Sequence, residues 1–114
     1  MAEKHVLVVD DEGAVRDLVA GMLRHLGYAS QTAANAIDAL SHIDTTAFDL
    51  VIADLHMPGM AGDQLADEIK KRKPMIPVLL ITGDQPETLP PSIDRLLHKP
   101  FSLSELREAL SALT

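Results

Sequence analysis

The sequence predicts an α/β fold in which short parallel strands alternate with helices. Short apolar runs typical of buried strands recur along the chain. Between them lie segments whose apolar residues are spaced three and four apart, as on one face of a helix. The 114 residues, of which 46% are apolar and 24% charged, suit one domain with one core. We therefore expect a single α/β domain over residues 1–114.

The first half of the chain contains three expected strands and two expected helices. The strands are expected at residues 5–9, 28–32 and 50–53, and the second of them is only weakly apolar. Apolar residues from Val15 to Leu26 recur at helical spacing, and Gly27 suits the position just past a helix end. A shorter helix is expected around residues 37–43, where isoleucine and leucine recur at the same spacing.

A third helix is expected around Leu65 and Ile69. It ends in the basic run Lys70–Lys73, after which Pro74 stops it. Because cations at a helix C-terminus interact favourably with the helix dipole, we interpret this run as structural rather than as a binding patch. Strands are then expected at residues 78–81 and 95–97.

The last helix has a clear start signal. Ser102 and Glu105 have the spacing of a capping box, in which each side chain accepts a hydrogen bond from the other residue's backbone N–H. Leucines at positions 103, 106, 110 and 113 then share one face. These residues predict a final helix that begins at residue 103.

The segment between Thr82 and Arg95 breaks the alternation. A fourth helix would be expected there, but the segment has only about a dozen residues and includes three prolines. Proline removes a helical hydrogen bond and clashes with the preceding turn. We therefore predict a degenerate fourth helix of at most one turn, at residues 86–89, followed by an extended connection.

Composition excludes several classes of partner. The net charge of −7 disfavours nucleic acid, because phosphates would be repelled. The apolar runs are too short to span a bilayer, so we expect no membrane insertion. The absence of cysteine excludes disulfides and thiolate metal sites. The N-terminus lacks the long apolar region of a signal peptide, so we expect a cytoplasmic protein.

Aspartates follow two of the expected strands. Asp10 and Asp11 come directly after the first strand, and Asp54 follows the third. In a parallel sheet both strands end at the same edge, where open α/β proteins have their sites. Three carboxylates that converge there repel one another unless a hard cation neutralises them. The sequence therefore predicts a Mg²⁺ site and chemistry on one of the three aspartates.

Two further residues complete a recognisable set. Thr82 follows the fourth expected strand, and Lys99 follows the fifth and precedes Pro100. With their neighbours, these residues make the segments Leu7–Glu12, Asp54–Met60, Leu80–Gly83 and His98–Phe101. The four segments, in this order, resemble the receiver domain of two-component response regulators, and the match covers essentially the whole chain. The resemblance implies a flavodoxin-like, doubly wound α/β fold with five parallel strands in the order 2-1-3-4-5.

The resemblance also implies a metal site. By this resemblance, Asp11 and Asp54 would bind Mg²⁺ directly, the backbone carbonyl of His56 and waters would complete an octahedron, and Asp10 would join the metal's ligands, directly or through water. The cation would offset the repulsion between the attacking carboxylate and an incoming phosphate.

Phosphoryl transfer is the implied chemistry. By this resemblance, Asp54 would be the phosphoacceptor, which takes a phosphoryl group from a histidine of a partner kinase. The Lys99 ammonium would pair with one phosphoryl oxygen, and the Thr82 hydroxyl would donate to another and move toward the phosphate. The Lys99–Pro100 peptide bond is implied to be cis.

The resemblance implies a signalling domain rather than a turnover enzyme. The expected partner is a sensor histidine kinase or a histidine phosphotransfer protein, and the downstream target stays open. The domain would act by phosphorylation-dependent protein binding or in a phosphorelay, as a monomer or weak dimer. Because the chain starts at Met1 and ends just after the last helix, we expect an independent regulator without an output domain. A receiver segment of a hybrid histidine kinase is the alternative.

Each residue of the set also has a simpler interpretation. An Asp-Asp pair before a helix often caps it, Asp54 could be a turn residue, and Thr82 could cap the segment after the fourth strand. The rival for the whole chain is a phosphorylation-independent adaptor on a receiver scaffold. A haloacid-dehalogenase-like phosphatase would need an aspartate where this chain has His56. A flavodoxin would need a hydroxyl-rich phosphate loop and aromatic residues to stack a flavin.

Three positions near the site depart from the family or vary within it. The family often has an aromatic residue three positions before the lysine, where this chain has Leu96. We therefore expect output through the first helix and nearby loops, or through the proline-rich segment. In the family, the positions of His56 and Asp84 modulate the water that attacks the acyl phosphate. His98 also flanks the site, and all five histidines lack the spacing of metal ligands.

Overall fold

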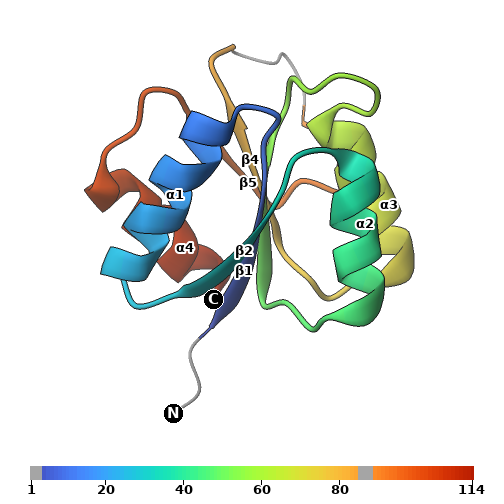
Figure 1. Cartoon of the computed structure of the whole chain (residues 1–114), viewed down its shortest axis with the longest axis horizontal. Coiled ribbons are helices and arrows are strands. Elements are labelled where there is room, and N and C mark those ends of the chain that lie inside the picture. The colour runs from blue at the N-terminus through green and yellow to red at the C-terminus, as the bar shows by residue number, and fades with distance from the viewer. Residues whose placement is uncertain (1–3, 85–88) are drawn as a thin grey trace.

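The computed structural model describes residues 4–84 and 89–114. Five parallel strands form one sheet in the order β2-β1-β3-β4-β5, which confirms the predicted topology. Figure 1 shows the sheet edge-on, with α1 and α4 on one face and α2 and α3 on the other. The elements in chain order are β1 (His5–Val9), α1 (Gly13–His25), β2 (Ala29–Ala33), α2 (Ala36–Thr45), β3 (Leu50–Asp54), α3 (Gly62–Arg72), β4 (Val78–Thr82), β5 (Arg95–His98) and α4 (Leu103–Leu113).

The three central strands are buried on both faces, which explains why they are apolar throughout. Successive side chains of a strand point to opposite faces of the sheet. In β1, Val6 and Val8 therefore pack with the core beneath α1 and α4, whereas Leu7 and Val9 pack with the core beneath α2 and α3. The edge strand β2 is only partly buried and correspondingly polar.

Several strand boundaries differ from the prediction by one residue. The strand β2 begins at Ala29 because the Tyr28 N–H donates to Leu23 O at 2.9 Å and so closes the end of α1. Gly27 adopts a φ of 92° in this turn, as expected just past a helix end. The strands β3, β4 and β5 each extend one residue further, to Asp54, Thr82 and His98, because each of these residues still pairs with a neighbouring strand.

The expected turn at residues 86–89 lies largely outside the described residues. Within residues 83–84 and 89–94 the chain forms no helix, so the described part of the domain has four helices. The capping box at Ser102 and Glu105 is confirmed. The Glu105 N–H donates to Ser102 Oγ at 3.1 Å, and the Ser102 N–H donates to Glu105 Oε1 at 3.0 Å. None of the helices in residues 4–84 and 89–114 is long and apolar enough to cross a membrane.

The basic run at the end of α3 forms ion pairs within the chain. Lys70 pairs with Asp94, Lys71 with Glu68 and Arg72 with Asp44. The pair of Lys70 and Asp94 is the least exposed of the three. This pairing agrees with a structural interpretation of the run.

Asp94 ties three segments together, so its removal should destabilise the domain. Its Oδ2 atom accepts hydrogen bonds from the Val78 N–H and from Lys70 Nζ, both at 2.7 Å. Asp94→Ala would leave the strand N–H unpaired, and we expect a loss of about 1–3 kcal/mol in the free energy of unfolding. Urea denaturation measures this loss. Asp44→Ala removes a more exposed ion pair and should cost less than about 1 kcal/mol, and equal losses would contradict the assignment.

Candidate functional site

The sequence-predicted site residues all lie at the C-terminal edge of the sheet. Asp10 and Asp11 follow β1, Asp54 ends β3, Thr82 ends β4 and Lys99 follows β5. The backbone also links neighbours along this edge, because the Lys99 N–H donates to Thr82 O at 2.8 Å. The parallel register therefore brings together residues from opposite ends of the sequence.

The three aspartates form one cluster. Each contributes a carboxylate oxygen, and these oxygens lie within 4.8 Å of one another. Asp10 is 3% and Asp54 is 6% exposed, whereas Asp11 faces solvent. The Lys99 ammonium lies 3.1 Å from Asp54 Oδ2 and 4.0 Å from Asp10 Oδ2. One lysine faces three acids, so the cluster retains an excess of negative charge.

Each of the three buried polar side chains of the site accepts a hydrogen bond from the backbone N–H two residues further along the chain. Asp10 Oδ1 accepts from the Glu12 N–H at 2.9 Å, Asp54 Oδ1 from the His56 N–H at 3.3 Å, and Thr82 Oγ1 from the Asp84 N–H at 3.0 Å. These are turns of the kind in which a side chain bonds to the backbone two residues on. They leave Oδ2 of both aspartates directed toward Lys99.

These turns also decide among the simpler interpretations of the residues. Asp10 and Asp11 do not cap α1, because the N-cap residue is Glu12 and its side chain makes no capping bond. Asp54 does act as a turn residue, as its alternative allowed, and Thr82 makes the same kind of turn rather than capping a helix in the described residues. The turn leaves Oδ2 of Asp54 and the hydroxyl hydrogen of Thr82 available, so a role in a turn and a role in chemistry are compatible. The Lys99–Pro100 peptide bond is cis, as the resemblance implied.

Burial and neighbouring charges perturb Asp10. Desolvation raises the pKa of Asp10 above its ordinary value, the hydrogen bond from the Glu12 N–H lowers it, and the nearby Asp54 charge raises it again. The ionised form of Asp10 is therefore disfavoured in the folded chain unless a cation compensates. Carboxylate oxygens at this spacing, with too little positive charge from protein side chains, fit a hard divalent cation such as Mg²⁺.

Asp10→Asn should stabilise the domain when divalent cations are absent. A raised pKa in the folded state means that stability falls as pH rises from 3.8 through the folded pKa and stays low above it. Asparagine keeps the Oδ1 acceptor but not the charge, so the variant should melt several degrees higher at neutral pH in EDTA. The difference should vanish as pH falls below 3.8. Asp17→Asn, at an exposed position of α1, is the control, and a lower melting temperature for Asp10→Asn would contradict the account.

Two supporting residues were not identified from the sequence. Arg16 Nη1 donates to Asp10 O at 2.8 Å and so fastens the start of α1 to the end of β1. Gly62 packs against the end of β3, where an added Cβ atom would lie 2.3 Å from Asp54 O. A glycine at the start of a helix hints at such a close approach, but no local pattern says which backbone approaches it.

His56 and Asp84, which lie two residues after Asp54 and Thr82, form a pair beside the site. His56 Nε2 lies 2.5 Å from Asp84 Oδ2, and both side chains are about two-thirds exposed. Each residue also donates its N–H to a buried side chain, His56 to Asp54 and Asp84 to Thr82. The pair therefore links the turn after β3 to the turn after β4. Both residues were singled out from the sequence, but their contact was not.

Comparisons with known proteins agree with this geometry. A family model described as the response regulator receiver domain matches residues 6–111. The sensor histidine kinase RcsC of Salmonella typhi is 34% identical over 111 residues, which cover 93% of this chain and 12% of RcsC. The probable transcriptional regulator ycf27 of Cyanidium caldarium is 34% identical over 116 residues, which cover 97% of this chain and 46% of ycf27. The chain spans less than half the length of these curated relatives.

Solved structures match over nearly their full length. The response regulator TrrA of Thermotoga maritima, in complex with Mg²⁺ and BeF, is 35% identical with a TM-score of 0.91, covering 97% of this chain and 99% of TrrA. The chemotaxis protein CheY4 of Vibrio cholerae is 27% identical with a TM-score of 0.90, covering 99% of this chain and all of CheY4. The family model, the relatives and the acidic cluster agree, and this chain therefore belongs to the response regulator receiver domain family.

Proposed function

We propose that this domain accepts a phosphoryl group on Asp54 from a histidine of a partner protein. One observation carries the proposal: a lysine ammonium lies 3.1 Å from a buried carboxylate that shares its edge of the sheet with two further carboxylates. An ordinary ion pair needs no additional acids. A site that binds both a cation and a phosphoryl group needs the acids for the cation and the lysine for the phosphoryl oxygens.

The transfer is a nucleophilic displacement at phosphorus. An oxygen of Asp54 attacks, the phosphorus–nitrogen bond to the donor histidine breaks, and the histidine nitrogen keeps the electron pair and takes up a proton. Lys99 holds Asp54 Oδ2 before the reaction and would then pair with a phosphoryl oxygen. Thr82 Oγ1 already accepts the Asp84 N–H, so its own hydroxyl hydrogen is left to donate to another phosphoryl oxygen.

Mg²⁺ is the cation that we propose for the acidic cluster. Asp11 and Asp54 would bind it directly, the backbone carbonyl of His56 would contribute a further oxygen, and Asp10 would bind directly or through water. When bound, the cation offsets the repulsion between the Asp54 carboxylate and the phosphoryl group. The crystal structure of TrrA in complex with Mg²⁺ and BeF supports this choice.

The proposed phosphoryl donor is a sensor histidine kinase or a histidine phosphotransfer protein, and we place the exchange in the cytoplasm. The kinship with RcsC, which is named a sensor histidine kinase, and with ycf27, which is named a transcriptional regulator, supports such a pathway. The domain would signal by phosphorylation-dependent binding or pass the group on, rather than turn over a substrate. The match to a small part of RcsC keeps a receiver segment of a hybrid kinase as the alternative to an independent regulator.

Intact-mass spectrometry after incubation with acetyl phosphate and Mg²⁺ tests the proposal. We expect one added phosphoryl group that requires Mg²⁺ and is absent in Asp54→Asn, which keeps the shape of the side chain. A beryllofluoride complex, observed by NMR, provides a second readout of the same site. If neither adduct nor complex forms in a folded protein, phosphoacceptor function is excluded.

A phosphorylation-independent adaptor would then be the function to pursue, and Leu96 is the observation that favours it. Its half-buried side chain packs against the core beside α2 and α3, at the position where the family often has a mobile aromatic ring. If the domain does switch, amide shifts on adding beryllofluoride should change in α1 and nearby loops or in residues 83–91. Changes centred on Arg95–Leu97 and α4 would contradict this prediction.

Removing the pair between His56 and Asp84 should shorten the lifetime of the acyl phosphate. The two side chains are exposed and belong to the turns that follow Asp54 and Thr82, so we expect them to hinder the approach of water to the phosphoryl group. We expect His56→Ala and Asp84→Ala to shorten the half-life about two- to tenfold, which corresponds to about 0.4–1.4 kcal/mol in the barrier. Loss of the mass adduct over time measures the half-life. Because the pair is exposed, the free energy of unfolding should change by less than about 1 kcal/mol. An unchanged or longer half-life of the acyl phosphate would contradict the prediction.

A further inference from the structure

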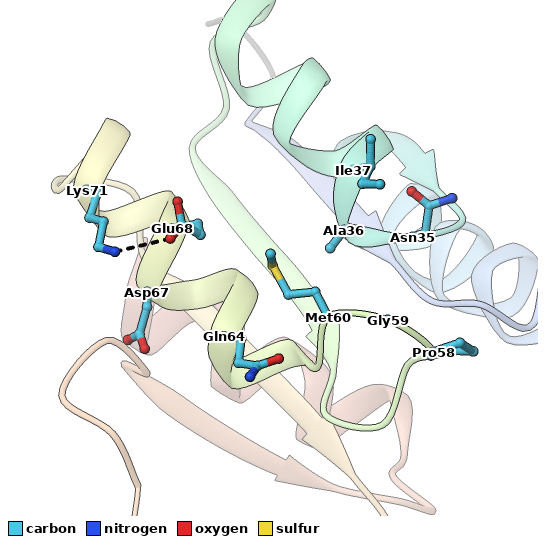
Figure 2. Close-up of a pocket in the computed structure, with 10 residues that line it drawn as sticks. All are labelled: Asn35, Ala36, Ile37, Pro58, Gly59, Met60, Gln64, Asp67, Glu68 and Lys71. Carbon is cyan, nitrogen blue, oxygen red and sulfur yellow. Dashed lines mark hydrogen bonds and ion pairs between the residues drawn. The ribbon is translucent and has the colours of Figure 1, made fainter.

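A groove of about 590 Å³ lies between α2 and α3, outside the acidic cluster. Figure 2 shows its three sides: the start of α2, the loop that follows β3, and the outer turns of α3. The Met60 side chain lies between the two helices in this view. Ile37, at the rim of the groove, is 80% exposed, which is unusual for a side chain that gains from burial. The groove therefore offers apolar surface to a partner.

Two acids and one lysine line the groove, and further acids lie at the starts of α2 and α3 beside it. Residues 33–41 and 55–69 supply all of the groove's lining except Lys71. They contain four acids and no lysine or arginine. Asp38 and Asp63 lie in the first turns of α2 and α3, where acids stabilise a helix for structural reasons. Asp67 lies in mid-helix, is exposed, and forms no ion pair with the described residues. Asp67 therefore neither stabilises the start of a helix nor takes part in an ion pair with the described residues.

The cations nearest the groove are already engaged. Lys71, the one basic residue of its lining, pairs with Glu68 at 3.1 Å, as the dashed line in Figure 2 marks. Lys70 and Arg72, its neighbours along α3, pair with Asp94 and Asp44. Among the described residues, no cation pairs with Asp67, so the groove keeps negative charge that residues 4–84 and 89–114 do not neutralise.

We propose that the α2–α3 groove, lined by Ile37, Met60 and Asp67 among others, docks a short basic segment of a partner protein that carries one or two large apolar side chains. The apolar side chains would cover Ile37 and Met60, and flanking lysines or arginines would face Asp67 and the acids at the start of each helix. A second copy of this chain is disfavoured as the occupant, because each copy has a net charge of −7. The inference does not depend on phosphorylation of Asp54.

A peptide titration followed by NMR of the ¹⁵N-labelled chain tests the inference. The probe is a synthetic six-residue peptide with two leucines and four lysines, and its counterpart has glutamates in place of the lysines. We expect the basic peptide to shift amides of residues 35–37, 58–60 and 64–71, with a Kd of about 0.1–1 mM. The affinity should fall as salt rises, because the attraction is partly electrostatic. The acidic peptide should not bind.

Matched variants separate the groove from general charge attraction. Ile37→Gln and Asp67→Lys should each weaken binding about fivefold or more. Met75→Gln removes an equally large apolar side chain that is 90% exposed outside the groove, and Glu108→Lys reverses an exposed charge on α4. Both controls should stay within about twofold of the parent chain. Thermal melts check that every variant is folded.

Three results would overturn the proposal. They are shift changes centred outside the groove, an unchanged affinity in either groove variant, and a loss in Glu108→Lys as large as in Asp67→Lys. Sedimentation of the unliganded chain adds a fourth, because self-association that Ile37→Gln abolishes would assign the groove to a second copy.

Discussion

Replacing Lys99 with methionine should slow phosphorylation of Asp54 by about 100-fold or more. Lys99 is the cation beside both buried aspartates of the site, 3.1 Å from Asp54 Oδ2 and 4.0 Å from Asp10 Oδ2. A preorganised charge that faces the transferred group typically contributes a factor of this size. Methionine keeps most of the length and apolar volume of the lysine stem. The rate of mass increase with acetyl phosphate and Mg²⁺ measures the loss.

Stability provides a second readout of the same change. Without Lys99, the buried carboxylates lose their counter-charge, and we expect the variant to lose about 1–3 kcal/mol in metal-free buffer. Mg²⁺ should raise the melting temperature of the variant more than that of the parent chain, because the cation would then be the sole compensating charge. Lys73→Met, at an exposed position beyond α3, should change neither quantity. A phosphorylation rate within twofold of the parent would contradict the role of Lys99.

Gly62→Ala should destabilise the domain although it adds a single methyl group. The added Cβ atom would lie 2.3 Å from Asp54 O and 2.8 Å from Leu80 Cδ1, closer than atoms can pack. The backbone carbonyl cannot rotate away, because it belongs to β3, so α3 must move or the strand end must distort. We expect a loss of about 1–3 kcal/mol, or about 4–12 °C in Tm. Phosphorylation should fall as well, since Asp54 is displaced.

Gly21→Ala is the matched control for this prediction. Gly21 lies within α1, and a Cβ atom there would meet nothing within 4 Å. The same substitution should therefore stabilise the chain by about 0.5–1 kcal/mol through helix propensity. If the free energy of unfolding falls in Gly62→Ala and rises in Gly21→Ala, the loss at Gly62 comes from its close approach to β3. It then does not come from the loss of a glycine as such. A Gly62→Ala variant as stable as the parent would refute the packing argument.

The strand-end aspartates show what sequence reasoning can reach. Apolar runs that end in Asp10 and Asp54 predict parallel strands, and parallel strands end at a common edge, so the cluster follows without any coordinates. The structure confirms that placement and the strand order. The chemical roles of Asp54, Thr82 and Lys99 stay predictions, because position alone does not demonstrate a reaction.

The differences between prediction and structure have a common cause. The strand β3 includes Asp54 because that residue pairs with Ile81 of β4, and β2 excludes Tyr28 because the end of α1 takes its N–H. In both cases a hydrogen-bond partner from another element decided the boundary. The periodicity of a single segment contains no information about such partners.

By itself, the sequence determined the architecture and the membership of the site. Alternating apolar runs and helical patterns are local properties, and they are sufficient to place acids, a threonine and a lysine at the ends of parallel strands. Only the tertiary structure decided which atoms meet: Lys99 with Asp54, Arg16 with the carbonyl of Asp10, and His56 with Asp84. The same is true of Gly62 and of the α2–α3 groove. Contacts between elements depend on how closely packed helices and strands approach one another, and that distance is set by the whole core rather than by any one segment.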